Sequence, residues 1–97
     1  MIENLGNKLK MLREERDLTM DLFVADFNNK NENMKPLNKS SVSRWENGEN
    51  TPSLDYAARI CEYYDISLDY LIGNTDVRTP SRLLAYSKKI RDIKNES

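Results

Sequence analysis

Four side chains between positions 39 and 44 carry hydrogen-bond donors at spacings that a helix would bring to one side. They are Lys39, Ser40, Ser43 and Arg44. A guanidinium can donate two parallel bonds to guanine, and a lysine or a serine can donate to a base edge or a phosphate. Residues three and four apart are neighbours on a helix. This pattern is typical of a helix that contacts the major groove of DNA, although a plain solvated helix face would have a similar composition.

The segment from Asn38 to Gly48 contains the signals of a complete short helix that would position these donors. Asn38 can accept a free N–H group of the first turn, and Gly48 can adopt the left-handed conformation that ends a helix. Val42 and Trp45 lie three apart and would form the buried face. A helix of about ten residues is not stable alone, so other helices must hold this one in place.

The rest of the sequence predicts an all-α protein with supporting helices on both sides of this segment. Leu5, Leu9 and Leu12 recur at helical spacing. Thr19, Ser53 and Ser67 can each cap a following helix. The expected helices besides the central one span residues 3–16, 20–28, 54–64, 68–72 and 81–94. The second is dense in apolar residues, which predicts burial on more than one side. The helix at 54–64 is expected to bury Leu54, Ala57, Cys61 and Tyr64, with Ala58 and Ile60 at the borders.

Residues 29–36 interrupt the helical pattern just before the four donors. They are rich in asparagine and end in Pro36, which disfavours a helical conformation at the residue before it. We expect an exposed, at most partly helical connection. It is either a plain surface loop or a second DNA contact through Lys30 or Lys35.

Composition gives no support for an enzyme or a metal site. The 97 residues contain no histidine and one cysteine, so neither an intramolecular disulfide nor a zinc site is expected. There is no nucleophile–base pair and no glycine-rich phosphate loop, so we expect no cofactor and no small-molecule substrate. Since no apolar run reaches membrane-spanning length and no signal peptide is visible, we expect a cytoplasmic protein without a membrane partner. Cys61 is interpreted as a small core residue, with a redox switch as the alternative.

Charge is distributed unevenly along the chain. Residues 1–77 carry 9 Lys and Arg against 14 Asp and Glu, a net charge of −5, and residues 78–97 carry 6 against 2, a net charge of +4. DNA contact by the first part must therefore depend on the local placement of cations.

Three stretches together resemble the helix-turn-helix domains of the Cro/C1 repressor family, also called XRE-like. They are residues 12–19 (LREERDLT), 42–54 (VSRWENGENTPSL) and 66–76 (ISLDYLIGNTD). Their order and spacing are close to those of the family, and the resemblance covers about residues 4–76. It implies a five-helix, lambda-repressor-like DNA-binding domain followed here by a C-terminal helix.

The resemblance also implies roles for individual residues. The expected base contacts are Lys39, Ser40, Ser43 and Arg44, and the expected phosphate contacts are Thr19, Ser41 and Asn47. Lys35 is added as a phosphate contact from its place in the inserted segment and not from the resemblance. Arg13 and Glu46 match positions that pair across the first and third helices, and with Val42 and Trp45 they would support the helix that reads DNA. If exposed, such an ion pair would contribute only about 0–1 kcal/mol, so its role would be geometric.

Two features depart from the family pattern. Residues 29–36 replace the usual tight turn, although some repressors of phages that infect Gram-positive bacteria have a similar lengthened segment. Met20 stands where the family usually has a glutamine that contacts a phosphate. Methionine cannot donate that bond, and neighbouring Thr19 is the expected substitute.

The resulting interpretation is a regulator that binds specific sequences of double-stranded DNA, most simply a repressor that binds a near-palindromic operator as a homodimer. Residues 1–76 would form the DNA-binding domain, and residues 77–97 a linker and a helix with an apolar seam of Leu83, Tyr86, Ile90 and Ile93. That helix would pack on its own domain, pair with another copy or lead into a further domain. The alternative is an antitoxin-like autoregulator whose main role is binding a protein partner. A toxin or an antirepressor stays open as that partner, and so does a chain that is part of a longer repressor.

Overall fold

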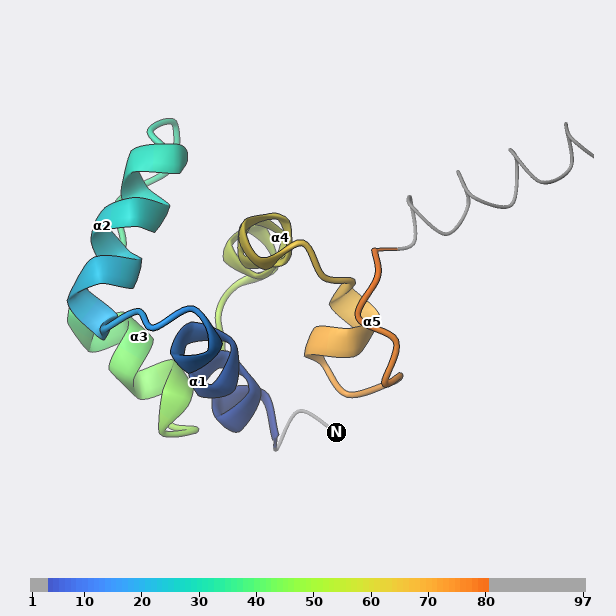
Figure 1. The fold of residues 1–97 in the computed structure, drawn as a ribbon. Coiled ribbons are helices and arrows are strands. Elements are labelled where there is room, and N and C mark those ends of the chain that lie inside the picture. The colour runs from blue at the N-terminus through green and yellow to red at the C-terminus, as the bar shows by residue number, and fades with distance from the viewer. Residues whose placement is uncertain (1–3, 81–97) are drawn as a thin grey trace, which may run out of the picture.

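The computed structural model describes residues 4–80, and within them it contains five α-helices and no strand. The helices are α1 (Leu5–Glu15), α2 (Met20–Lys30), α3 (Lys39–Glu46), α4 (Leu54–Tyr64) and α5 (Leu68–Leu71), shown in Figure 1. The expected all-α fold and the order of its first five helices are therefore confirmed. The helix expected at 81–94, with its apolar seam, lies outside the described residues.

Polar side chains begin four of these helices as the sequence predicted. Thr19, Asn38, Ser53 and Ser67 each accept a hydrogen bond from the backbone N–H three residues ahead. These bonds satisfy N–H groups that have no partner inside the helix. Gly48 and Gly73 have positive φ angles of 77° and 87° just after α3 and α5, where a left-handed residue ends a helix without steric cost.

One apolar core joins the helices around α3. Leu5, Leu9 and Leu12 are buried on α1, as their spacing predicted. They belong to a cluster whose other members lie on α2 to α5, apart from Leu37 and Ile66 in the connections: Phe23, Phe27, Leu37, Val42, Trp45, Ala57, Ile60, Cys61, Tyr64, Ile66, Tyr70 and Leu71. α3 packs mainly against α1 and α2 (Figure 1). Within residues 4–80, no helix is both long enough and apolar enough to span a membrane.

The predicted inner face of α4 is confirmed at Ala57, Cys61 and Tyr64, which are buried, but it was wrong at Leu54 and Ile60. Leu54 is 72% exposed, whereas Ile60, expected at the border, is only 1% exposed. Leu54 lies on the correct stripe, but it is the first residue of the helix and extends past the edge of the core. The expected two-sided burial of α2 was also wrong, because Leu22 and Ala25 are exposed and only Phe23 and Phe27 are fully buried.

The connection between α2 and α3 is partly helical at its start and mostly exposed, as predicted, but it is more closely packed onto the domain than expected. α2 continues to Lys30, and the non-helical part spans residues 31–38. Asn31 is buried where exposure was expected, and Leu37, which follows the predicted exposed stretch, is buried as well. Leu37 joins the core, and the Asn31 side-chain amide donates to the carbonyl of Phe27 at 2.9 Å. The connection is therefore packed onto the domain at its start and its end.

The segment after α5 is attached to the body of the domain. The N–H of Ser67 donates to the carbonyl of Arg78 at 2.9 Å. The Arg78 guanidinium forms two hydrogen bonds with the Glu15 carboxylate, at 2.9 and 3.2 Å. Arg78, in the segment expected to begin a linker, thus contacts both the start of α5 and α1.

Candidate nucleic-acid interface

The outer face of α3 forms an open hollow whose lining contains all four predicted base contacts. Its lining residues are Lys39, Ser40, Ser43, Arg44 and Glu49. Three of the four donors are exposed and Ser43 is half-buried. The helical spacing therefore brings them together as expected, and they can reach a molecule that approaches this face.

The opposite face of α3 is anchored in the core. Val42 and Trp45 are buried, as expected. The Trp45 ring packs against Tyr56 of α4, with ring centroids 6.0 Å apart. A helix of this length depends on such tertiary contacts for stability, so the anchored face keeps the outer donors in place.

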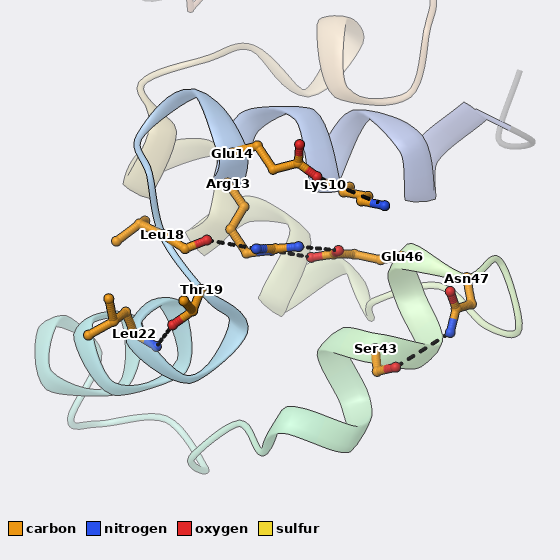
Figure 2. Close-up of polar contacts among 9 residues, drawn as sticks. All are labelled: Lys10, Arg13, Glu14, Leu18, Thr19, Leu22, Ser43, Glu46 and Asn47. Atoms are coloured by element: carbon orange, nitrogen blue, oxygen red, sulfur yellow. Dashed lines mark hydrogen bonds and ion pairs between the residues drawn. The ribbon is translucent and has the colours of Figure 1, made fainter.

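An ion pair between α1 and α3 fixes the C-terminal end of α3. The Arg13 Nε and Nη2 atoms donate to the two oxygens of Glu46 at 2.8 and 2.9 Å, and Nη1 donates to the carbonyl of Leu18 at 2.6 Å (Figure 2). The predicted pair is therefore present. Only 11% of the Arg13 side chain and 3% of the Glu46 side chain are exposed, so this is not the weak surface pair considered above. Removing either partner would leave a buried charge, which typically costs about 3–5 kcal/mol.

Gly6 lets α1 approach this end of α3 closely. A Cβ atom at Gly6 would lie 2.5 Å from the Glu46 carbonyl oxygen and 2.6 Å from that of Trp45. Neither oxygen can move independently, because both belong to the backbone. The sequence analysis missed this residue, although a glycine inside a helical pattern is itself a signal of close packing.

The predicted phosphate contacts lie outside the hollow. Thr19 is exposed and its Oγ1 accepts the N–H of Leu22 at 3.1 Å (Figure 2), a bond that leaves the hydroxyl hydrogen free to donate elsewhere. Met20, beside it, is half-buried and packs against the core. Its apolar side chain thus has a packing role at the position where the family usually has glutamine.

The other three predicted phosphate contacts lie at the two ends of α3. Asn47 is exposed, is the C-cap residue of α3, and donates from Nδ2 to Ser43 Oγ at 3.4 Å (Figure 2). Ser41 is half-buried in the first turn, and its N–H donates to the Asn38 side chain at 2.8 Å. Lys35 is exposed, and its carbonyl accepts a hydrogen bond from Tyr56 Oη at 2.6 Å.

Acidic groups stand directly beside the cations of this face, which the sequence analysis did not foresee. Asp21 Oδ2 lies 3.5 Å from Lys39 Nζ, and Glu49 lines the hollow with Arg44. Lys30 points elsewhere: its Nζ lies 3.3 Å from Asp26 and 5.0 Å from the centroid of the Tyr63 ring on α4. The cations available on the α3 face are thus few and partly neutralised.

Comparison with known proteins agrees with this geometry. Residues 37–71, from the end of the connection through α5, match the family model described as helix-turn-helix. The resemblance stated from the sequence is thereby confirmed over these residues, and it supports a DNA-binding regulator. The chain is also similar to antitoxin PezA of Streptococcus pneumoniae serotype 4 (strain ATCC BAA-334 / TIGR4), with 26% identity over 90 residues. That match covers 93% of this chain and 52% of the antitoxin, so the chain spans about half the length of this relative. No solved structure matches the chain.

Proposed function

We propose that this helix-turn-helix protein represses transcription by binding a near-palindromic operator as a dimer, with α3 inserted in the major groove. The observation that carries the proposal is the two-sided construction of α3. Lys39, Ser40, Ser43 and Arg44 line one open face. The other face is buried, and the Arg13–Glu46 pair holds its end. A rigid helix with outward donors is what direct readout of base edges requires.

In this proposal each group of residues has a separate task. Arg44 donates two bonds to a guanine, and the lysine and two serines contact neighbouring base edges. Thr19, Ser41, Asn47 and Lys35 contact phosphates on either side and set the docking orientation. Repression follows because the bound protein occludes the polymerase or a competing regulator.

The dimer gives the operator its symmetry. Two copies related by a two-fold axis would place their α3 helices in successive major grooves, about 34 Å apart. Residues 77–97 are proposed to supply the dimer contact or to connect the DNA-binding domain to a further part of the protein.

The experiment that tests this function is selection of bound sites from random duplex DNA, with the mass of the protein measured on and off DNA. We expect an enriched motif with two similar half-sites and a complex with two protein copies. No enriched motif at low salt would overturn sequence-specific binding. Enrichment of a single non-palindromic half-site would overturn the symmetric dimer alone.

A second candidate function is that of an antitoxin-like autoregulator whose main role is to bind a protein partner. The similarity to antitoxin PezA favours it. In that case we expect the product of a gene adjacent to this one to inhibit growth when expressed alone, and this chain to relieve the inhibition and to co-purify with that product. Neighbouring products with neither property would contradict this candidate and leave the repressor intact.

A further inference from the structure

We propose that the side chain of Asn28 positions the N-terminal end of α3, and thereby determines how the bases facing that end are read. The inference rests on the DNA-binding function proposed above. It assigns a positioning role to a residue on α2 that is not itself on the α3 face. The lengthened connection would then be a built support for α3 rather than a loop that merely tolerates extra residues.

Asn28 pairs with the backbone of Leu37 through both halves of its amide. Its Nδ2 donates to the Leu37 carbonyl at 2.9 Å, and its Oδ1 accepts the Leu37 N–H at 2.8 Å. Leu37 directly precedes Asn38, whose side chain caps α3 through the N–H of Ser41. The two bonds therefore hold the peptide that leads into the first turn of α3. They connect it to the last part of α2, nine positions earlier in the chain.

Other contacts hold the rest of the connection in the same shape. The N–H of Met34 donates to the carbonyl of Asn31 at 3.0 Å, which closes a turn at the far end of α2. The Tyr56 hydroxyl on α4 donates to the Lys35 carbonyl at 2.6 Å. Leu37 itself is buried in the core. Asn28 holds the C-terminal end of the connection, where the connection joins α3.

The C-terminal end of α3 is held by different residues. Arg13 binds Glu46, and Gly6 of α1 lies against the carbonyl oxygens of Trp45 and Glu46. Loss of the Asn28 bonds should therefore release only the N-terminal end of the helix. Lys39 and Ser40 lie at that end, whereas Arg44 lies close to the end that stays fixed. The expected consequence is an uneven loss of sequence readout.

The test compares relative affinities for every single-base variant of the site that the wild-type protein selects. Lys39→Ala and Arg44→Ala first locate the base pairs read by each end of α3. Asn28→Ala should then reduce discrimination at the base pairs assigned to Lys39 by about fivefold or more, the lower range for one base contact. Discrimination at the Arg44 base pair should change by less than about twofold on the same scale. Relative affinities measured in one sample do not depend on how much of the protein is folded, so a purely structural role would not change them.

Two further variants control this experiment. Asn29→Ala alters the neighbouring exposed asparagine on α2 and should leave the profile unchanged. Tyr56→Phe removes only the hydroxyl bond to Lys35. It should reduce discrimination at the same base pairs as Asn28→Ala, but by a smaller factor. If Asn28→Ala does not fold, Tyr56→Phe carries the test alone. A uniform loss of affinity with an unchanged profile in both variants would overturn the inference.

A second measurement separates this inference from the proposed function. Hydrogen exchange of backbone amides in the free protein reports each end of α3 without DNA. Asn28→Ala should speed exchange at Ser41 and Val42, whose N–H groups are bonded to Asn38, and leave Asn47 and Glu49 unchanged. Equal acceleration at both ends would refute the positioning role. If the wild-type protein selects no DNA motif, the readout part of the inference falls with the proposed function, and the exchange data still decide the positioning part.

Discussion

Arg44 has the most demanding geometry of the four donors on α3, because a guanidinium reads guanine only when both of its bonds are aligned. Arg44→Ala should therefore relax the preference at one base pair by about 1–3 kcal/mol and leave the others nearly unchanged. Asn47→Ala, which removes a proposed phosphate contact, should weaken binding to all sequences similarly. Quantitative binding to a panel of site variants measures both effects. A uniform loss for Arg44→Ala would assign it to the phosphate backbone instead.

In the proposed complex, Asp21 would compete with DNA for the charge of Lys39. The two side chains are 74% and 62% exposed, so their pair contributes little to stability. In the proposed complex, however, the Asp21 carboxylate would both neutralise the proposed contact residue Lys39 and repel phosphates. Asp21→Asn should raise affinity by about two- to fivefold at low salt, and the gain should shrink as salt screens the charges.

Glu62→Gln is the matched control for this effect, since it removes the same charge from the outer side of α4. An equal gain in both variants would show that net charge matters rather than the place of Asp21. Titration of a labelled operator at several salt concentrations makes the comparison.

The donors could be identified from residue type and helical spacing alone, because both are local properties. The approach of Asp21 and Glu49 to them could not, since it depends on how α2 and the residues after α3 fold back in space.

The role of Cys61 could be only partly predicted from the sequence. The sequence left a core residue and a redox switch open, and burial raises the pKa of its thiol to about 11. At neutral pH the thiol stays protonated and a poor nucleophile, which favours the core interpretation.

At the scale of elements, the contact between α1 and α3 depends on Gly6 having no side chain. Gly6→Ala would improve the helix propensity of α1 by about 1 kcal/mol. It would also force a methyl group against two backbone oxygens, and overpacking of this kind costs about 1–3 kcal/mol. Because the added Cβ would lie well inside contact distance of both oxygens, we expect net destabilisation.

Urea denaturation measures this change, with Asn7→Ala on the exposed side of α1 as control. A more stable Gly6→Ala protein would show that α3 can shift away without loss. In that case the Gly6 contact would not define the position of α3.

The helices themselves were largely predictable, because caps and apolar spacing are encoded within each segment. Errors appeared where burial depends on a neighbour. Leu54 fits the stripe of α4 but is exposed at the start of that helix, and Leu37 lies in a polar stretch yet enters the core. The Asn28 pair with Leu37 joins positions nine apart without any periodic signal, so no local pattern could reveal it.

For the whole molecule, the proposed dimer makes a prediction about spacing. Adding about five base pairs between the two half-sites would rotate one by half a helical turn and place it on the opposite side of the duplex. We expect the full chain to bind such a site at least about tenfold more weakly, and as one copy, because a symmetric dimer can no longer occupy both grooves. Sedimentation of protein–DNA complexes gives affinity and copy number. Unchanged affinity would argue for independent monomers.

The attachment of Arg78 to Glu15 has a mechanical meaning for such a dimer. Glu15 and Arg13 lie two residues apart on α1, and Arg13 holds the end of α3. Arg78, near the end of the described residues, is therefore linked to α3 through α1. A force applied at Arg78 would be transmitted to α3 through α1, whereas an unattached flexible linker would not transmit it. In the proposed complex, a partner bound to the residues beyond position 80 would therefore influence the angle between α3 and the DNA.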